Sequence, residues 1–297
     1  FRRVLFRSAT GSGKSTTVYS ILHRLNKEET NIITVEDPIE MNITGINQIQ
    51  TNSEIGLDFA TALRSILRQD PNIIMVGEIR DTETAKIAVR ASITGHLVFS
   101  TIHTNNSLTT IERLMDMNVE RYLLSSALTG IVSQKLARRL CPHCKQLRKT
   151  TAYEKEIFKR ALNVDVHEVY DAKGCENCRN GYTGRIAIQE VLLIDDFLRD
   201  AINNSEISRD ELRELVYTKD VTTLLQDGLE KVAEGITSFE EIYKLIEIDD
   251  ALDEIYNNDF EITTSNKTYE EEEQLDLLND SLSQTEVLDL GTIQNNG

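Results

Sequence analysis

The chain carries Ser8-Ala9-Thr10-Gly11-Ser12-Gly13-Lys14-Ser15-Thr16 directly before residues 17–25, which favour a helix. Gly11 and Gly13 let backbone N–H groups turn toward a polyphosphate, because no Cβ obstructs a tight turn. Lys14 supplies a mobile cation for phosphate oxygens, Ser15 supplies a hydroxyl for Mg²⁺, and the following helix adds a partial positive charge. The stretch from Thr10 to Thr16 therefore predicts a phosphate-binding loop. Ser8 stands where glycine is usual, and a glycine-rich surface turn is the alternative.

Residues 1–7 should form the strand that leads into this loop, yet three arginines interrupt them. A buried parallel strand normally reads as a continuous run of Val, Ile and Leu. Two interpretations stay open: the first eight residues are a truncation or junction scar, or they form an edge strand with exposed arginines.

Carboxylates follow two further strand-like runs. Residues 31–35 are rich in β-branched side chains and precede Glu36-Asp37-Pro38-Ile39-Glu40, where Pro38 ends the strand. Residues 73–77 form an apolar run that ends in Glu78. Doubly wound sheets bind ligands at the carboxyl ends of their strands, so these acids are expected beside the loop. A solvated acidic turn is the alternative for residues 36–40.

Residues 57–68 and 82–93 show helical periodicity, and each segment lies between two strand-like runs. The third such run is residues 97–101, which His103 follows. Repeated alternation of strand and helix predicts a parallel sheet with right-handed crossovers. His103 is then either a structural hydrogen-bonding residue or a group that contacts the terminal phosphate of a nucleotide.

Three stretches resemble the signature motifs of the secretion ATPase superfamily: residues 67–81, the acidic box at 35–40 and the histidine box at 100–105. The resemblance runs from about residue 9 to 245. It implies an α/β, RecA-like P-loop NTPase fold that hydrolyses ATP with Mg²⁺. It also implies that Glu40 is the general base, that Glu78 is the Walker B acid, and that His103 senses the γ-phosphate, beside Lys14.

The same resemblance implies a homo-hexameric ring motor for type II secretion or type IV pilus assembly. Such a motor is cytoplasmic, associates peripherally with the inner membrane and acts on a platform protein there. A DNA-uptake or conjugation ATPase of this superfamily is one alternative, and a nucleotide-binding regulator without turnover is another. The resemblance also implies that a preceding domain of the family contributes arginines to the neighbouring subunit's nucleotide, and we expect assembly and full activity to depend on that domain.

Two Cys-x-x-Cys pairs, Cys141/Cys144 and Cys175/Cys178, contain every cysteine of the chain. Two such pairs predict a tetrahedral Zn²⁺ site rather than disulfides, and four thiolates leave no open position for catalysis. Their separation implies an inserted lobe that is short of large apolar residues and depends on the metal for folding. By resemblance, this lobe is typical of assembly and secretion ATPases and is usually missing from retraction motors.

A basic run flanks the first pair and consists of Lys135, Arg138, Arg139, Lys145, Arg148 and Lys149. We interpret it as an interface or membrane-proximal patch rather than a nucleic-acid site, since no aromatic platform accompanies it. The net charge of −17 also argues against a general nucleic-acid binder, and no specific nucleic acid is expected.

The expected organisation has four parts: a RecA-like ATPase core at 1–138, a tetracysteine zinc lobe at 139–185, a helical subdomain at 186–248 that begins with a strand, and an acidic tail at 249–297. Residues 251–297 hold twelve acids and one base, so −11 of the total charge belongs there. Such a composition is typical of disorder. We find no signal peptide and no apolar run of the ~20 residues that cross a bilayer.

Overall fold

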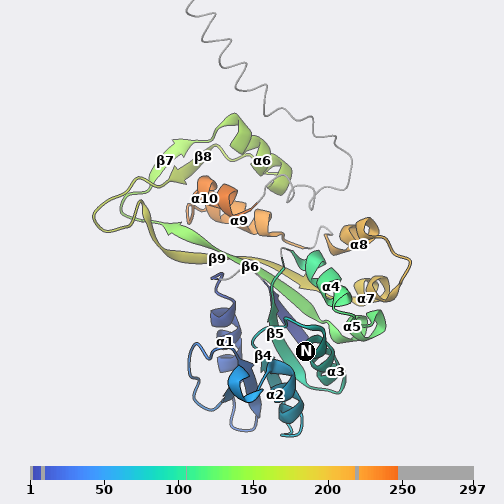
Figure 1. The fold of residues 1–297 in the computed structure, drawn as a ribbon. Helices are drawn as coiled ribbons and strands as arrows, with labels where there is room; N and C mark the ends of the chain where they lie inside the picture. Colours follow the sequence, from blue (N-terminus) through green and yellow to red (C-terminus); the bar gives the residue numbers. More distant parts are fainter. Residues whose placement is uncertain (1–2, 8–10, 105, 218–220, 247–297) are drawn as a thin grey trace, which may run out of the picture. The chain divides into compact units, whose positions relative to one another are not determined.

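A seven-stranded sheet organises the part of the chain that the computed structural model describes, namely residues 3–7 (backbone only), 11–104, 106–217 and 221–246 (Figure 1). The strand order is β3-β2-β4-β5-β1-β6-β9, and every neighbouring pair is parallel except β6 with β9. These strands are β1 (Arg3–Arg7), β2 (Ile32–Glu36), β3 (Asn47–Gln50), β4 (Ile73–Val76), β5 (Leu97–Ile102), β6 (Gly130–Leu140) and β9 (Tyr182–Leu193). The predicted α/β fold with a mainly parallel sheet is confirmed.

Strand β1 lies inside the sheet, where it pairs with β5 on one side and with β6 on the other. The expectation of an edge strand is therefore wrong. Its two arginines, Arg3 and Arg7, suggested exposure, but the ladder is made by backbone groups, which pair whatever side chains the strand carries. The other interpretation, a truncation or junction scar at residues 1–8, stays a prediction.

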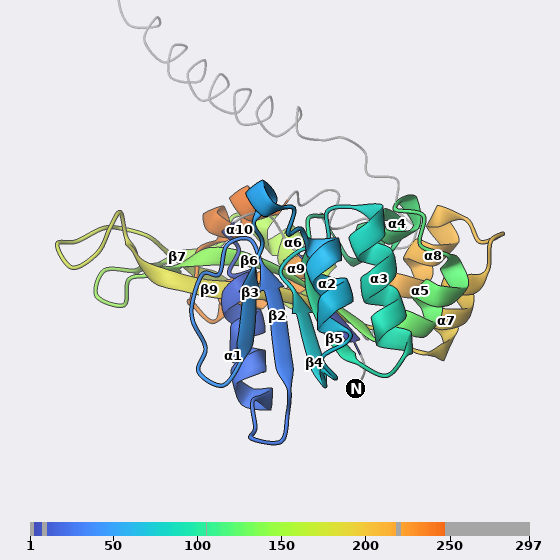
Figure 2. The ribbon, with the colours of Figure 1, turned by 60° about the horizontal axis from the view of Figure 1, so that its bottom comes forward.

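Helices cover both faces of the sheet, which explains the continuous apolar character of its central strands (Figure 2). Helix α1 (Lys14–Leu25) packs on one face, where it meets Ile73 and Met75 of β4. The opposite face buries Ile74 and Val76 of the same strand. The helices on that face are α2 (Phe59–Ile66), α3 (Thr82–Ile93), α4 (Ser107–Asp116), α5 (Arg121–Ala127), α7 (Asp196–Asn203) and α8 (Arg209–Val216).

Asp58 and Asp81 set where α2 and α3 begin, because each side chain accepts a hydrogen bond from a backbone N–H in the first turn. Helix α3 has the predicted bounds, whereas α2 is shorter at both ends than the predicted helix at 57–68. A 3₁₀ turn, η1 (Ser53–Ile55), lies between β3 and α2.

The long strands β6 and β9 continue beyond the rest of the sheet and carry a second layer of structure. A separate apolar cluster forms there, in which Phe158 and Ile157 are buried against Leu229 and Ile242. The elements around it are β7 (Gln146–Lys149), α6 (Ala152–Leu162), β8 (Glu168–Asp171), α9 (Leu224–Ala233) and α10 (Phe239–Leu245). The lobe between the cysteines thus buries Ile157 and Phe158 against the C-terminal helices, which the sequence did not predict, whereas Leu147 is exposed.

The predicted domain boundaries at 138/139 and 185/186 fall within β6 and β9. The predicted helical subdomain also contributes to two different cores, since α7 and α8 pack on the main sheet and α9 and α10 pack with α6. The domain division therefore stays a prediction. The acidic tail from residue 249 lies outside the described residues.

Candidate functional site

The loop between β1 and α1 has the backbone shape that the glycines predict. Gly11 and Gly13 adopt left-handed φ angles of +83° and +82°. A Cβ on Gly13 would also lie 3.1 Å from Nε2 of Gln134, so this position requires glycine for two reasons. Lys14 opens helix α1, and no side chain among the described residues caps that helix end. An end of this kind binds anions through its backbone N–H groups. The predicted loop residue Thr10 lies outside the described residues.

Glu78 and His103 meet beside this loop. Glu78 follows β4 and His103 follows the neighbouring strand β5, and His103 Nε2 lies 3.3 Å from Glu78 Oε2. Arg80 forms an ion pair with Glu78 and lies 3.4 Å from Asp37, which follows β2. The structure therefore brings together groups from three strand ends, as the parallel topology predicted.

The environment of Glu78 keeps its carboxylate ionised. Its side chain is only 16% exposed, and this burial by itself raises the pKa. The hydrogen bond from Arg80 and the charges of Arg80, His103 and Lys14 outweigh the burial, so the pKa lies below its usual value. An ionised carboxylate near Lys14 is the state that a magnesium shell requires.

Two acids of the acidic box, Glu36 and Glu40, differ in burial. Glu36 is buried and accepts hydrogen bonds from Tyr19, from Thr34 Oγ1 (2.5 Å) and from Gln48 Nε2 (3.0 Å). Burial, together with the Glu36 hydrogen bond and charge, raises the pKa of Tyr19. Tyr19 Oη in turn accepts a bond of 3.3 Å from the backbone N–H of Glu40. The Glu40 residue is exposed, so its backbone is held while its carboxylate faces solvent.

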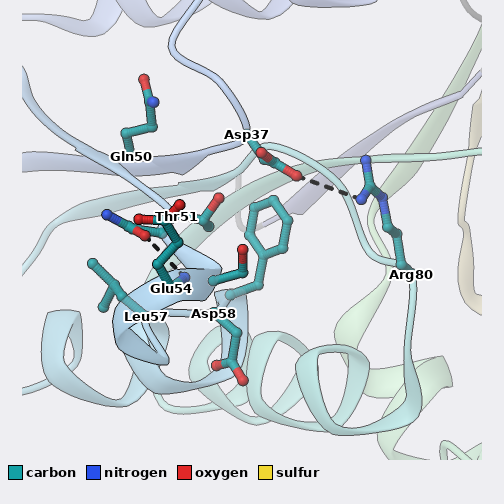
Figure 3. Close-up of a pocket in the computed structure, with 10 residues that line it drawn as sticks. Asp37, Gln50, Thr51, Glu54, Leu57, Asp58 and Arg80 are labelled. Carbon is teal, nitrogen blue, oxygen red and sulfur yellow. Dashed lines mark hydrogen bonds and ion pairs between the residues drawn. The ribbon is translucent and has the colours of Figure 1, made fainter.

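A pocket of about 570 Å³ opens next to these acids, between the ends of β2 and β3 and the start of α2 (Figure 3). Asp37 and Arg80 form its boundary with the Glu78 cluster, and their ion pair crosses one side of it. Asp58 and Glu54 add acidic groups to the wall. The edge of the sheet at which the parallel strands end therefore carries this pocket in addition to the phosphate loop.

Two polar pairs on β6 and β9 support the site and were missed in the sequence; three of their residues are buried and Gln189 is half-buried. Gln134 faces Gln189 beneath the phosphate loop, and Ser133 faces Glu190 next to the start of α4. Glu190 is fully buried and accepts hydrogen bonds from the backbone N–H and the hydroxyl of Ser107. A Ser-Gln step inside a long apolar strand is the signal that could have identified them, but the strand at 130–140 was itself not predicted.

The four cysteine sulfurs form a compact cluster at the far end of the β6–β9 pair. The Sγ–Sγ distances are 3.9 Å for Cys141–Cys175, 3.7 Å for Cys144–Cys178 and 3.6 Å for Cys175–Cys178. A tetrahedron with metal–sulfur bonds of ~2.3 Å has edges of about 3.8 Å, so the donor set fits one zinc ion.

Backbone hydrogen bonds favour the thiolate of one of these sulfurs, Cys178. The N–H of Cys175 donates to Cys178 Sγ over 3.2 Å. Burial raises the pKa of Cys178, but hydrogen bonds from Cys175 outweigh it and lower the pKa to about 7. The pKa values of Cys144 and Cys175 are raised, because burial and the neighbouring thiols outweigh the backbone hydrogen bonds to their sulfurs. Gly181 lets the chain turn here, since its φ is +83° and a Cβ would lie 2.6 Å from Ala172.

Most of the predicted basic patch is engaged within the fold. Arg138 makes a bidentate pair with Glu241, and Arg148 bonds Glu154 and Asp171. Lys145 donates to the carbonyl of Gly235, and Lys135 donates to that of Leu245. Arg139 and Lys149 are exposed. The run therefore ties β6 and the cysteine lobe to the C-terminal helices through Lys135, Arg138 and Lys145, and Arg148 joins elements within the lobe.

Comparison with known proteins places this geometry in a family. The model of the type II/IV secretion system protein family matches residues 2–244. The chain belongs to this family. It is 48% identical over 248 residues to type II secretion system protein E of Klebsiella pneumoniae, covering 82% of this chain and 48% of that relative. It is also 48% identical over 240 residues to the type IV pilus assembly ATPase PilB of Thermus thermophilus, covering 80% of this chain and 27% of that protein.

Two solved structures share the fold. The pilus retraction motor PilT with bound ADP superimposes with a TM-score of 0.62 at 29% identity, over 82% of this chain and 61% of that one. The ATPase DotB of Legionella pneumophila gives a TM-score of 0.59 at 25% identity, over 82% and 60%. The chain spans about half the length of the type II secretion relatives that it matches. Among its described helices, none combines the length and the apolar character of a membrane span.

Proposed function

We propose that the chain is the motor portion of an ATPase that hydrolyses ATP in order to drive protein secretion or pilus assembly. One observation supports this most strongly: Glu78 and His103 converge beside Lys14 at the carboxyl ends of neighbouring parallel strands. Phosphate-binding folds place their catalytic groups at that edge. Relatives named as ATPases over the same residues support the proposal.

Each residue has a distinct part in this proposal. The loop residues Gly11, Ser12 and Gly13 present backbone N–H groups to the phosphates, together with Thr10 and Thr16, while Lys14 balances the charge that develops on the γ-phosphate. Ser15 and ionised Glu78 hold Mg²⁺ and its water shell. Glu40 accepts the proton of the attacking water, and its exposed side chain on a fixed backbone can swing to a bound nucleotide. His103, which is 48% exposed, contacts the γ-phosphate.

The relatives make a ring motor of type II secretion or type IV pilus assembly the best-supported system. A homo-hexamer that acts on an inner-membrane platform protein, from the cytoplasmic side, is the arrangement we propose. The cysteine cluster favours assembly or secretion over retraction, and one Zn²⁺ on Cys141, Cys144, Cys175 and Cys178 would have a structural role. A DNA-uptake or conjugation motor of the same family is the second candidate.

The test is phosphate release by the full-length protein with ATP and Mg²⁺. Parent protein should release phosphate continuously, and Lys14→Ala should reduce the rate to background because the γ-phosphate loses its cation. Lys27→Ala, an exposed lysine just after α1, is the matched control and should keep the parental rate. Parent protein that binds ATP but releases no phosphate would instead support a regulator without turnover.

A further inference from the structure

A buried amide side chain lies beneath the described part of the phosphate loop, beside Leu136. Gln134 of β6 is 2% exposed, and it lies one residue beyond the last β6 residue that pairs with β1. That position is where β1 ends and the loop begins. A buried primary amide has two donors and an acceptor to satisfy, and an arrangement that satisfies them fixes its neighbours.

The amide of Gln134 bonds to the loop on both sides of Gly13. Its Nε2 donates to the carbonyl of Ser12 over 2.8 Å. Its Oε1 accepts from Thr17 Oγ1 over 3.0 Å, in the first turn of helix α1. One side chain therefore joins the loop backbone to the helix whose N-terminus the phosphates would contact.

The same amide is anchored from behind. Gln189 Nε2 of β9 donates to Gln134 Oε1 over 2.8 Å, so the two glutamines form a cross-strand pair at directly opposite positions. The backbone N–H of Gln189 donates to Asp227 of α9 over 2.8 Å, and Lys231 pairs with that carboxylate. Gln134 can therefore neither rotate away nor leave the loop without breaking bonds on β9.

The direction of these bonds matters for phosphate binding. Because the Ser12 carbonyl is bonded to Gln134 below the loop, this peptide oxygen points away from the side on which an anion would bind. The opposite orientation would turn a carbonyl toward the phosphates and repel them. Gln134 thus selects the backbone orientation in which N–H groups face the anion.

We propose that Gln134 is a positioning residue for nucleotide binding, which holds the phosphate loop in its anion-accepting shape through Ser12 and Thr17. This inference rests on the proposed ATPase function and assigns to that site a residue outside its motifs. It predicts that Gln134 changes affinity for nucleotide rather than the rate of the chemical step, because the loop is needed equally in the ground and transition states.

The experiment measures steady-state phosphate release and binding of a fluorescent ATP analogue by the full-length protein. Gln134→Met keeps the length of the side chain and removes its hydrogen bonds. We expect the KM for ATP and the analogue's Kd to rise about tenfold, since a buried carbonyl loses its partner, with kcat within about twofold of the parent. Gln146→Met, on the exposed strand β7, should match the parent in both values.

A second variant approaches the contact from the loop. Thr17→Val removes the hydroxyl that donates to Gln134 Oε1 and also lies 3.2 Å from the Gly13 carbonyl, and it keeps the side-chain shape, so it should raise KM severalfold. Combined with Gln134→Met it should add less than its separate effect, because both changes remove one shared bond. Thermal unfolding of each variant shows how much protein is folded. A purely structural role would lower the apparent kcat with the folded fraction and leave KM at the parental value.

The outcomes separate this inference from the proposed function. Parent protein that neither binds the analogue nor responds to Lys14→Ala contradicts the function itself. Parent protein that binds, with Gln134→Met binding equally well, overturns the positioning role and leaves the function standing. Additive effects of Gln134→Met and Thr17→Val would likewise overturn it.

Discussion

Strands β6 and β9 run past two sites that are held together by different forces. At Ser133–Gln134 and Gln189–Glu190 they lie within the main sheet, where β6 also pairs with β1. At Leu140 and Tyr182 the two strands pair only with each other among the described strands. The cysteine pairs lie directly beyond this point, since Cys141 follows Leu140 and Cys178 comes shortly before Tyr182. The phosphate-loop end is thus supported by a sheet that is covered on both faces, and the cysteine end by side-chain bonds together with the smaller apolar cluster around Phe158.

The difference shows in what each end buries. The described part of the loop, residues 11–13, follows a sheet with apolar side chains on both faces and is bonded to Gln134 of that sheet. Around the cysteines, hydrogen-bonded ion pairs such as Arg148 with Glu154 and Asp171 join short elements. Four sulfurs in contact repel one another once they are ionised, so this end needs a cation in the centre. We infer that the loop end is preorganised by packing and the cysteine end by metal.

The largest effect should be on ATP turnover, from a change at the nucleotide site. Glu40→Gln keeps the shape of the side chain and removes the base, so ATP should still bind while turnover falls by at least ~10²-fold. Phosphate release and binding of the fluorescent analogue measure the two properties separately. Glu28→Gln, an exposed acid after α1, should match the parent. Turnover of Glu40→Gln at the parental rate would show that the acidic box does not contain the base.

Replacing one cysteine should loosen the cysteine end before it affects the rest of the protein. We expect one zinc per chain in the parent by metal analysis and substantially less in Cys175→Ser. Trypsin should then cut the variant rapidly after Lys173 and Arg179, the exposed basic residues on either side of the second cysteine pair. Helix α6 should stay protected longer, because Phe158 is buried against the C-terminal helices.

The parent serves as the control for this cleavage. Parent protein that holds no metal and still resists trypsin between residues 141 and 178 would show that the ion pairs alone are sufficient.

A smaller effect is expected on the thermal stability of the cysteine lobe at low pH. Burial raises the pKa of Glu154, but the hydrogen bonds from Arg148 and Thr151 outweigh it, so the pKa lies below its ordinary value of 4.5. A depressed folded-state pKa stabilises the protein fully above that ordinary value, and the contribution disappears as the pH falls through the folded pKa. The thermal midpoint of the parent should therefore drop about 2–4 °C more than that of Glu154→Gln between about pH 5 and pH 3.

Circular dichroism follows both proteins through this range. Glu156→Gln, on the exposed side of α6, is the matched control and should keep the parental slope. Identical slopes for the parent and Glu154→Gln would show that this ion pair adds no pH-dependent stability.

Sequence reasoning succeeded where local chemistry carries the information. The loop glycines, the acids at strand ends and the cysteine pairs each require particular residue types at fixed spacing, so the mainly parallel sheet and the meeting of Glu78 with His103 could be predicted. The position of β1 inside the sheet could not, because strand pairing depends on the whole sheet rather than on the arginines of β1.

Long-range pairing also explains what was missed. Gln134 and Gln189 are 55 residues apart in the sequence, and neither belongs to a motif. Arg138 and Glu241 are 103 residues apart in the sequence, so the sequence alone predicted a surface patch and not this ion pair. The shared core of α6, α9 and α10 likewise joins segments that periodicity describes only one at a time.

Removal of the metal tests the contrast between the two ends most directly. The full-length protein is treated with a strong chelator, and trypsin cleavage after Lys173 is measured beside the Kd for the fluorescent ATP analogue, without Mg²⁺ in either sample. We predict rapid cleavage at the cysteine end and a Kd within about twofold of the untreated protein, because the loop rests on the packed sheet through Gln134. A loss of nucleotide affinity in parallel with the cleavage would contradict the account, since it would show that the metal also organises the phosphate loop.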